Sequence, residues 1–296
     1  METWIIFTFM AAFMQSIRTA GQKKISNYLS PMTTTLVRYM FGVPFAVCYL
    51  WIVIPDNPLG IVFASVNSRD FFIYASLASV AQIAATVWLV KVLSFRNFAV
   101  ATIFSKTEAI QTAVLGVVFF SASLSWHGWL AVILGAIGIF IMGFPGAGRR
   151  PESKSIYYGI LSGLGFAFTA LWLRQASLSL HYTFIQNAAI TLVYMVSVQT
   201  IMCVTFVAIK ERNQIALLMK HIPLAIFVGA TSALGSVGWY TAMTYENAAL
   251  VRSLGQIELV FAVVITYLFF NEKISTRELF GMLIIVLSVL ILLLLV

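Results

Sequence analysis

Charged residues are scarce in this chain: 9% of its 296 residues are Asp, Glu, Lys or Arg, whereas 61% are hydrophobic. A soluble domain is about one quarter charged and about half apolar. With so few polar side chains, a soluble fold of this size could not cover its surface. The composition therefore excludes a cytosolic enzyme, a disordered chain and a secreted disulfide scaffold, and it predicts a polytopic membrane protein.

Residues with redox, metal-binding or catalytic chemistry are also few. Cys48 and Cys203 lie inside apolar runs with no CxxC partner, so no disulfide framework and no metal site is predicted. The three histidines fall at the ends of apolar runs, and the sequence holds no metalloprotease motif, no serine-hydrolase motif and no acidic cluster. We therefore expect no catalytic residues, no cofactor and no metal. A channel is disfavoured because no filter-like loop appears.

Long apolar runs dominate the sequence. A helix needs about 20 mostly apolar residues to cross the hydrocarbon core, whereas a barrel strand would be shorter and strictly alternating. The first run has no basic segment or cleavage site, so it is predicted to be retained. We predict an all-α polytopic fold of ten transmembrane helices over 3–20, 32–54, 71–93, 97–120, 127–144, 157–178, 184–209, 223–244, 247–270 and 279–296.

An internal repeat is suggested by comparing the chain with itself at an offset of about 150 residues. Asn97 then aligns with Asn247, and Glu108 aligns with Glu258. Both glutamates lie about twelve residues into their spans, so both are expected near the bilayer centre. Matched acidic residues inside apolar spans are harder to attribute to chance than matched leucines.

The repeat predicts two similar halves joined by a polar segment. The first five-helix repeat is predicted over 1–144, a basic linker over 145–156 and the second five-helix repeat over 157–296. An odd number of spans makes the halves enter the membrane from opposite sides. Such inverted repeats, related by a pseudo-twofold axis in the membrane plane, are typical of secondary transporters.

The basic residues predict how the chain is oriented. Most of them fall in the odd-numbered loops, whereas the even loops and both termini hold Arg69, and Arg174 if it is counted as a loop residue. The positive-inside rule then places the odd loops in the cytoplasm and both termini outside a bacterial-type inner membrane. This topology signal accounts for most of the net charge of +8, so no nucleic-acid partner is expected. The odd-loop residues are Lys23, Lys24, Arg96, Arg149, Arg150, Lys154, Lys210, Arg212, Lys220, Lys273 and Arg277.

A few polar residues lie deep in the predicted spans, where a charge costs roughly 2.5–3.5 kcal/mol. Helical spacing of 3.6 residues per turn puts Lys106, Arg252 and Gln256 on one face of their spans and Glu108 and Glu258 on the other. The first group is a candidate substrate site. The glutamates are candidates for proton coupling, because a low dielectric disfavours a charged carboxylate. The alternative is that these groups neutralise one another as buried helix–helix pairs.

Other candidates lie nearer the span ends or are aromatic. Snorkelling to the interface explains Arg18, Arg38, Lys91 and Arg174, and substrate contact is the alternative. An aromatic belt or a cavity lining explains Trp88, Trp172, Trp239 and Tyr240. The mid-span amides Gln15, Gln82 and Gln111 either bind substrate or join helices. Of these, the candidate substrate ligands are Arg18, Gln82, Trp88, Lys91, Trp239 and Tyr240, with Arg38 structural. Small residues over 135–138 and 159–163 predict close helix packing.

Several motifs resemble the drug/metabolite transporter superfamily, EamA type, over almost the whole chain. The stretch Gly238–Met243 through Glu246–Leu250 is similar to the family's segment joining spans 8 and 9. Asn271-Glu272-Lys273 resembles its Gly-Glu-Lys/Arg ending of span 9, and Arg38 matches an arginine often seen in span 2. This chain departs from the family in having Ala109 and Leu259 where a mid-span proline is common, which puts the gating flexibility attached to that proline in doubt.

The resemblance implies a proton- or gradient-driven carrier of small organic solutes, with a central cavity bounded by both halves. The basic, aromatic and acidic side chains favour a zwitterionic or anionic, amino-acid-like metabolite, moved by alternating access. A multidrug or toxic-metabolite exporter is the alternative, and a membrane-embedded enzyme is the rival from another class. Many bacterial relatives carry their basic residues in the even loops, so the opposite bias here suggests an importer. Expected partners are the substrate, the lipid bilayer and protons, with the chain acting as a monomer or homodimer.

Overall fold

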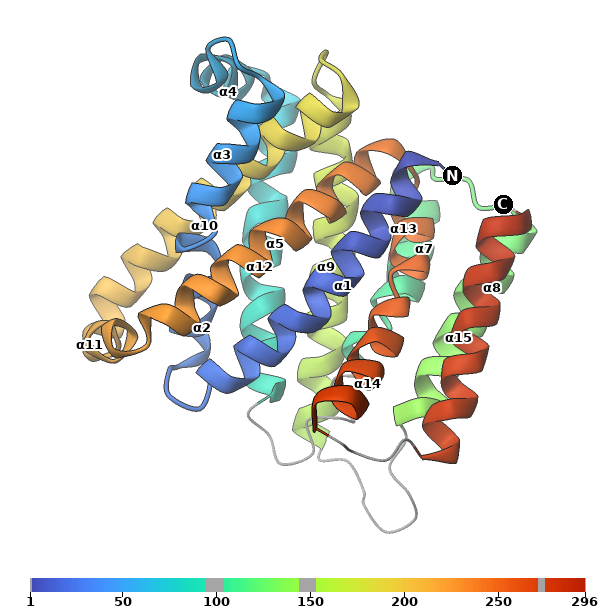
Figure 1. Cartoon of the computed structure of the whole chain (residues 1–296). Helices are drawn as coiled ribbons and strands as arrows, with labels where there is room; N and C mark the ends of the chain where they lie inside the picture. The colour runs from blue at the N-terminus through green and yellow to red at the C-terminus, as the bar shows by residue number, and fades with distance from the viewer. Residues whose placement is uncertain (1, 94–103, 144–152, 271–274, 296) are drawn as a thin grey trace.

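The computed structural model describes residues 2–93, 104–143, 153–270 and 275–295. Over these ranges the regular structure is α-helical, and no strand is found (Figure 1). Six of the described helical segments are long and apolar enough to cross a membrane. They are Pro31–Val53, Arg69–Leu93, Ser153–Leu178, Phe184–Lys210, Ile222–Tyr245 and Thr276–Leu295. Two shorter apolar helices accompany them, so the expected total of ten remains a prediction.

The helices of the first part of the chain begin at recognisable signals. Ser30 caps helix α2 (Pro31–Met40) because its side chain accepts a hydrogen bond from the Thr33 amide. Pro31 occupies the first position of this helix, where its missing N–H costs nothing. The bounds are α1 (Thr3–Ile25), α2 (Pro31–Met40), α3 (Val43–Val53), α4 (Pro58–Val66), α5 (Arg69–Leu93), α7 (Glu108–Phe120) and α8 (Trp126–Gly143).

The second part of the chain uses the same local rules. Thr183 and Gln186 form a reciprocal capping box at the start of α10. The bounds are α9 (Ser153–Leu178), α10 (Phe184–Lys210), α11 (Arg212–Lys220), α12 (Ile222–Tyr245), α13 (Ala248–Leu254), α14 (Ile257–Phe270) and α15 (Thr276–Leu295). The predicted linker, 145–156, lies outside the described ranges as far as residue 152, and its last residues, 153–156, begin α9.

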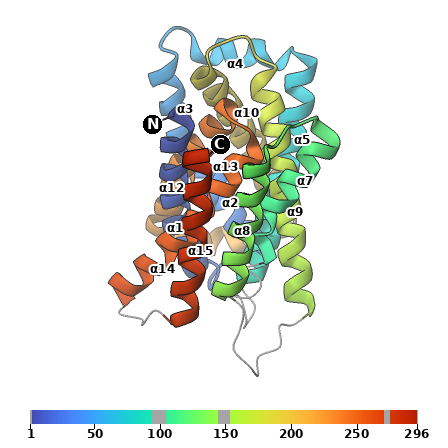
Figure 2. The same cartoon turned by 90° about the vertical axis from the view of Figure 1, so that its right-hand side faces the viewer.

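The helices pair reciprocally between the two predicted halves. In Figures 1 and 2, α1 lies along α12, α5 lies along α9, and α8 lies along α15. In the predicted repeat, α1 corresponds to α9 and α12 corresponds to α5. A pseudo-twofold axis would exchange the α1–α12 and α5–α9 contacts and map the α8–α15 contact onto itself. The two five-span repeats themselves stay a prediction.

Two predicted spans are broken near mid-depth, at corresponding places in the repeat. Helix α13 ends at Leu254 and α14 starts at Ile257, with turn residues between them. In the other half, turn residues Lys106 and Thr107 precede α7. Glycines permit both breaks, because a Cβ on Gly255 would lie 2.2 Å from the Trp239 ring and one on Gly163 would lie 2.9 Å from the Ser105 carbonyl.

Small residues hold the outer helices close together, as expected. A Cβ on Gly138 of α8 would lie 2.9 Å from the Gly281 carbonyl oxygen of α15, and one on Gly281 would lie 2.6 Å from the Gly138 carbonyl oxygen. Such close backbone approach stabilises helix pairs in lipid, where burial of apolar surface gives little driving force. The prediction of close packing in 135–138 and 159–163 is confirmed at Gly138 and Gly163.

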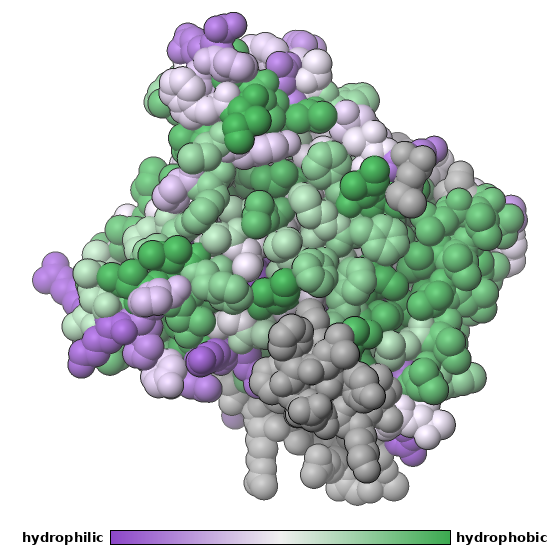
Figure 3. Space-filling model, in the orientation of Figure 1, coloured by the Kyte–Doolittle hydropathy of each residue, from purple (hydrophilic) through white to green (hydrophobic). Residues whose placement is uncertain are grey.

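The outer surface suits a bilayer. Large apolar side chains project outward from many helices, among them Ile52, Phe63 and Phe119. Figure 3 shows hydrophobic residues across the middle of one face and hydrophilic residues gathered toward its ends. Both termini lie at one end of the molecule, whereas the α1–α2 turn and α11 lie toward the other (Figure 1).

Candidate functional site

A cavity lies inside the molecule between the broken helices. Its lining combines residues of α1, α2, α5 and the Ser105–Glu108 segment with residues of α9, α12, α13 and α14, so both predicted halves contribute. The space open to the centre of a water molecule is about 40 Å³, enough for a few waters. The charged lining residues are Arg18, Arg38, Lys106, Arg252, Glu108 and Glu258.

Four of these residues form what we call the ion-pair cluster: Lys106 with Glu258, and Arg252 with Glu108. The Lys106 Nζ lies 2.5 Å from a Glu258 carboxylate oxygen, and the Arg252 Nε lies 2.7 Å from Glu108 Oε1. Each pair joins one predicted half to the other. The two glutamates that align in the repeat therefore each take a cation from the opposite half. Because buried charges are stable only when compensated, the cluster ties the halves together at the centre of the molecule.

The prediction that the cations and the carboxylates occupy separate faces was wrong. It assumed continuous helices through Lys106 and Glu258. The turns before α7 and between α13 and α14 reset the rotation of the chain, so all four side chains reach one cavity. The sequence contains no mid-span proline to announce either break, and the glycine that accommodates one of them lies on another helix.

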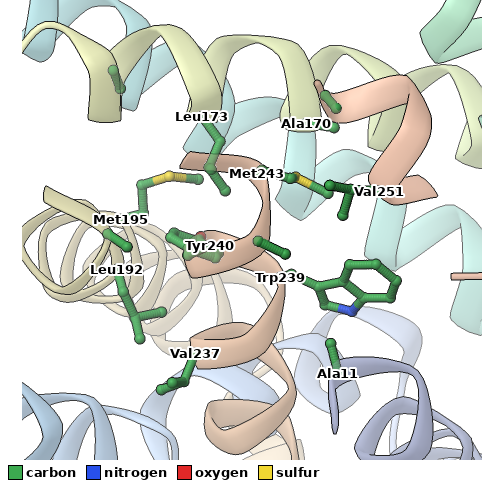
Figure 4. Packing of buried hydrophobic residues seen from close by; sticks show 14 of the residues in the cluster. Ala11, Ala170, Leu173, Leu192, Met195, Val237, Trp239, Tyr240, Met243 and Val251 are labelled. Atoms are coloured by element: carbon green, nitrogen blue, oxygen red, sulfur yellow. The ribbon is translucent and has the colours of Figure 1, made fainter. Parts of the chain in front are cut away.

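An amide and an indole extend the cluster toward α12. Gln15 donates a hydrogen bond to Glu258 over 2.6 Å, and Trp239 donates one to the Gln15 amide oxygen over 2.8 Å. The Arg252 guanidinium carbon lies 4.6 Å from the centre of the Trp239 ring, in cation–π contact. Trp239 and Tyr240 lie on α12 among buried apolar side chains such as Ala11 and Met243 (Figure 4). The aromatic-belt alternative is therefore wrong for both residues, which are 5% and 2% exposed.

Arg18 and Arg38, which we call the arginine pair, line another part of the cavity. Both are buried, with 2% and 4% exposure, so the expected snorkelling to the interface is wrong for them. Arg38 donates to the Thr86 hydroxyl over 2.9 Å and lies 5.3 Å from the centre of the Tyr39 ring. Among the described residues, none forms a hydrogen bond or ion pair with Arg18. Arg38 was expected to be structural, and it also lines the cavity.

A hydrogen-bonded wall stands beside the arginine pair. The Gln82 amide oxygen accepts hydrogen bonds from Gln199 over 2.7 Å and from the Tyr240 hydroxyl over 3.2 Å. The Tyr39 hydroxyl lies 3.2 Å from the Gln82 carbonyl oxygen. These contacts fix the orientation of Gln82, which lines the cavity as the sequence predicted. A wall held this way presents its polar groups in fixed positions.

Other predicted site residues lie elsewhere. Trp88 and Lys91 are not among the cavity-lining residues, and the Lys91 amine donates to the Tyr158 hydroxyl over 2.8 Å. Gln256 lines a smaller adjoining space, where its amide packs against Gly135. Arg174 donates to the backbone carbonyls of Met243 and Glu246 near the end of α12. The candidate motif at 271–273 and the repeat partner Asn97 lie outside the described residues.

Small hydroxyl residues complete the lining, and the sequence reasoning missed them. Thr19, Ser105, Thr169 and Ser236 all line the cavity. Single Ser and Thr residues carry little signal in a transmembrane run, because their hydroxyls can bond to the backbone of their own helix, as Thr169 does to the Gly165 carbonyl. Only the helix arrangement brings these hydroxyls together.

Further hydrogen bonds join the predicted halves away from the cavity. Toward the α11 end, the Ser30 and Thr33 hydroxyls donate to the Glu211 carboxylate, and the Ser30 amide donates to Gln214 over 2.9 Å. Toward the end with the termini, the Asn247 amide donates to the Ser123 carbonyl over 3.1 Å.

Fold and site together define a multi-pass helical membrane protein with a charged internal cavity, and comparisons with known proteins agree. The model of the EamA-like transporter family matches residues 2–144 and 153–294. An uncharacterized transporter of Archaeoglobus fulgidus is 24% identical over 192 residues, and the match spans 64% of each chain. A solved crystal structure covers 98% of this chain and 96% of its own with a TM-score of 0.73; at 10% identity, the likeness is one of fold alone.

The chain belongs to the EamA-like transporter family, within the drug/metabolite transporter superfamily, because the family model matches nearly its whole length. Membership of this family agrees with the transporter class that the sequence motifs predicted. The family assignment does not name a solute.

Proposed function

We propose that the protein is a secondary active transporter that carries a small zwitterionic or anionic organic metabolite across the inner membrane by alternating access. The observation that carries this proposal is the cavity itself, which is internal, charged and lined by both predicted halves. Polar side chains inside a membrane protein are costly, and they mark solute or ion pathways when they face a cavity. Discontinuous helices at mid-depth are a recurring feature of carrier binding sites.

Contacts on both sides of the cavity support alternating access. The Glu211 contacts join the halves toward the α11 end, and the Asn247–Ser123 contact joins them toward the opposite end. In the proposed cycle, the halves rock so that one set opens while the other stays closed. The cavity then faces one side of the membrane at a time.

Proton coupling is proposed to pass through the ion-pair cluster. Glu108 and Glu258 are buried, and each is held by a cation that a substrate anion could attract. A carboxylate that loses its cation in a low-dielectric site favours its protonated form. Substrate binding and proton binding would then be linked.

The lining favours a metabolite carrier over the alternative of a multidrug exporter. Its charged residues are mainly cationic, and its volume is small. Hydrophobic or cationic drugs are better matched by large apolar pockets. The charge and size of the cavity do not distinguish an importer from an exporter, because the coupling gradient sets the direction of transport.

Transport can be tested with purified protein in proteoliposomes and a panel of labelled amino acids and small organic acids. We expect saturable uptake of at least one anionic or zwitterionic solute, stimulated by a proton gradient. Replacing both glutamates, as Glu108→Gln with Glu258→Gln, should abolish proton-driven accumulation. The matched control Asp70→Asn, at an exposed carboxylate outside the cavity, should leave it unchanged. Proton-coupled flux that survives in the double variant would refute the coupling role, and a panel without any transported solute would refute the function.

The orientation has its own test. The odd loops are predicted to be cytoplasmic and the C-terminus to lie outside. A reporter that is active only outside the cytoplasm should therefore be active when it is fused to the C-terminus. A cytoplasmic C-terminus would reverse the proposed topology without affecting the transport proposal.

A further inference from the structure

The cavity holds more cations than carboxylates. Its lining has four cationic side chains and two acidic ones, and both acidic side chains are engaged in the ion-pair cluster. The arginine pair therefore has no carboxylate of its own within the described lining. A guanidinium keeps its charge in proteins, so this part of the cavity carries about two uncompensated positive charges.

The two arginines are built into the interior rather than drawn to the surface. Arg18 is 2% exposed, and its Nε is buried without a hydrogen-bond partner among the described residues. Arg38 is 4% exposed, and the neutral Thr86 hydroxyl is the group that receives its hydrogen bond. Both are cavity-lining residues. A buried charge without a counter-charge is costly, so retaining two of them beside one cavity calls for a ligand that supplies the counter-charge.

Building on the proposed transport function, we infer that the substrate is a compact dianion whose two negative charges are neutralised by Arg18 and Arg38. The planar fork of a guanidinium matches the oxygens of a carboxylate or a phosphate, with two parallel hydrogen bonds each. A small dicarboxylate and a phosphate monoester share this chemistry. A neutral zwitterion would leave the excess charge in place, and a monoanion would remove half of it.

The neighbouring groups fit a compact polar molecule. Ser236 adds a hydroxyl to the lining, whereas the Thr19 and Thr169 hydroxyls donate to backbone carbonyls of their own helices. Leu89, Phe166 and Leu173 add apolar surface to the lining. The space open to the centre of a water molecule is only about 40 Å³, which favours a short carbon skeleton over an extended one.

Matched ligands isolate the second charge. Methyl phosphate and methyl sulfate have the same tetrahedral shape, but at about pH 7.5 the phosphate carries close to two charges, because its second pKa is about 6, and the sulfate carries one. Malonate and its monoamide differ in the same way among carboxylates. Binding of each of the four ligands to the full-length, detergent-solubilised protein is measured as a rise in melting temperature. Transport of each ligand is measured by counterflow in proteoliposomes.

We expect at least one dianion to bind about tenfold or more tightly than its monoanionic match, and the phosphate and malonate arms to identify which oxyanion is preferred. Arg18→Gln and Arg38→Gln should each weaken dianion binding about 10- to 100-fold, the range for a lost charge-assisted hydrogen bond. Arg18→Lys should retain part of the affinity, because it keeps the charge but loses the fork. Arg69→Gln, at an exposed arginine outside the cavity, should change nothing.

Equal affinity for dianions and their monoanionic matches would overturn the inference. So would saturable transport of a zwitterion or cation that Arg18→Gln and Arg38→Gln leave unchanged, and that result would still support the transporter proposal. A protein that neither binds nor moves any solute, including the amino acids of the wider panel, would refute the transport function itself and the inference with it.

Discussion

The arginine pair and the ion-pair cluster line the same cavity with the same kinds of side chain, yet they differ in one respect. In the cluster, each cation faces a carboxylate from the opposite half, at 2.5 and 2.7 Å. In the arginine pair, the contacts are to neutral groups such as Thr86 and Tyr39. Buried charges that are paired internally hold helices together, whereas buried charges without a carboxylate partner are available to a ligand of opposite charge. On the proposals above, the cluster joins the halves and couples protons, and the arginine pair binds the solute.

Breaking the cluster should have the largest effect on stability. Glu108→Leu leaves Arg252 buried without its carboxylate, which should destabilise the protein by about 3–5 kcal/mol. The unfolding midpoint of the purified protein in detergent measures the loss. Adding Arg252→Met should restore most of the stability, because an apolar replacement of a whole buried pair is often neutral. A double variant no more stable than Glu108→Leu alone would show that the pair is not the reason for the loss.

Removing the hydrogen bonds that link the cluster to α12 should have an intermediate effect. Gln15→Leu deletes the bonds to Glu258 and Trp239; it leaves the buried Trp239 N–H without a partner, although Glu258 keeps Lys106, at a cost of about 1–3 kcal/mol. The same unfolding measurement applies. Gln111→Leu is the matched control, because Gln111 donates only to Thr107 one turn earlier on its own segment. Equal losses for the two variants would contradict the linking role of Gln15.

Changing the arginine pair should have the smallest effect on stability, and one of opposite sign. Arg18→Met removes a buried charge without stranding a partner, so the ligand-free protein should become more stable by about 0.5–2 kcal/mol. Melting curves of the variant and the parent protein, recorded without added anions, measure the change. Destabilisation comparable to that of Glu108→Leu would mean that Arg18 has a structural counter-charge, and the contrast between the two regions would disappear.

The sequence predicted the class of fold and many of the cavity's residues, because few polar groups are tolerated inside apolar helices. Lys106, Glu108, Arg252 and Glu258 stand out against their surroundings for that reason. Their mutual arrangement did not follow from spacing. Helical rotation can be extrapolated only while the helix is continuous, and the turns at Lys106 and Gln256 interrupt it.

Depth within a span was a weaker guide than charge. Arg18 and Arg38 lie close enough to predicted span ends for snorkelling, so their burial depends on which helices surround them. Helix α12 packs against both α1 and α2, and this encloses the two side chains. Helix packing also decides which tryptophan lines the cavity. Trp239 and Trp88 both lie in apolar runs, but only Trp239 is among the cavity-lining residues.

The crossing of the ion pairs between the halves also bears on how such a chain can evolve. Each half carries one cation and one acid of the cluster, yet neither half satisfies its own. After an ancestral duplication, a substitution at position 106 would be tolerated only with a compensating change at position 258, more than 150 residues away. Substitutions at positions 108 and 252 should be coupled in the same way. Among descendants, these positions should change in pairs, and a half exchanged between distant relatives should function only if its charges match those of its new neighbour.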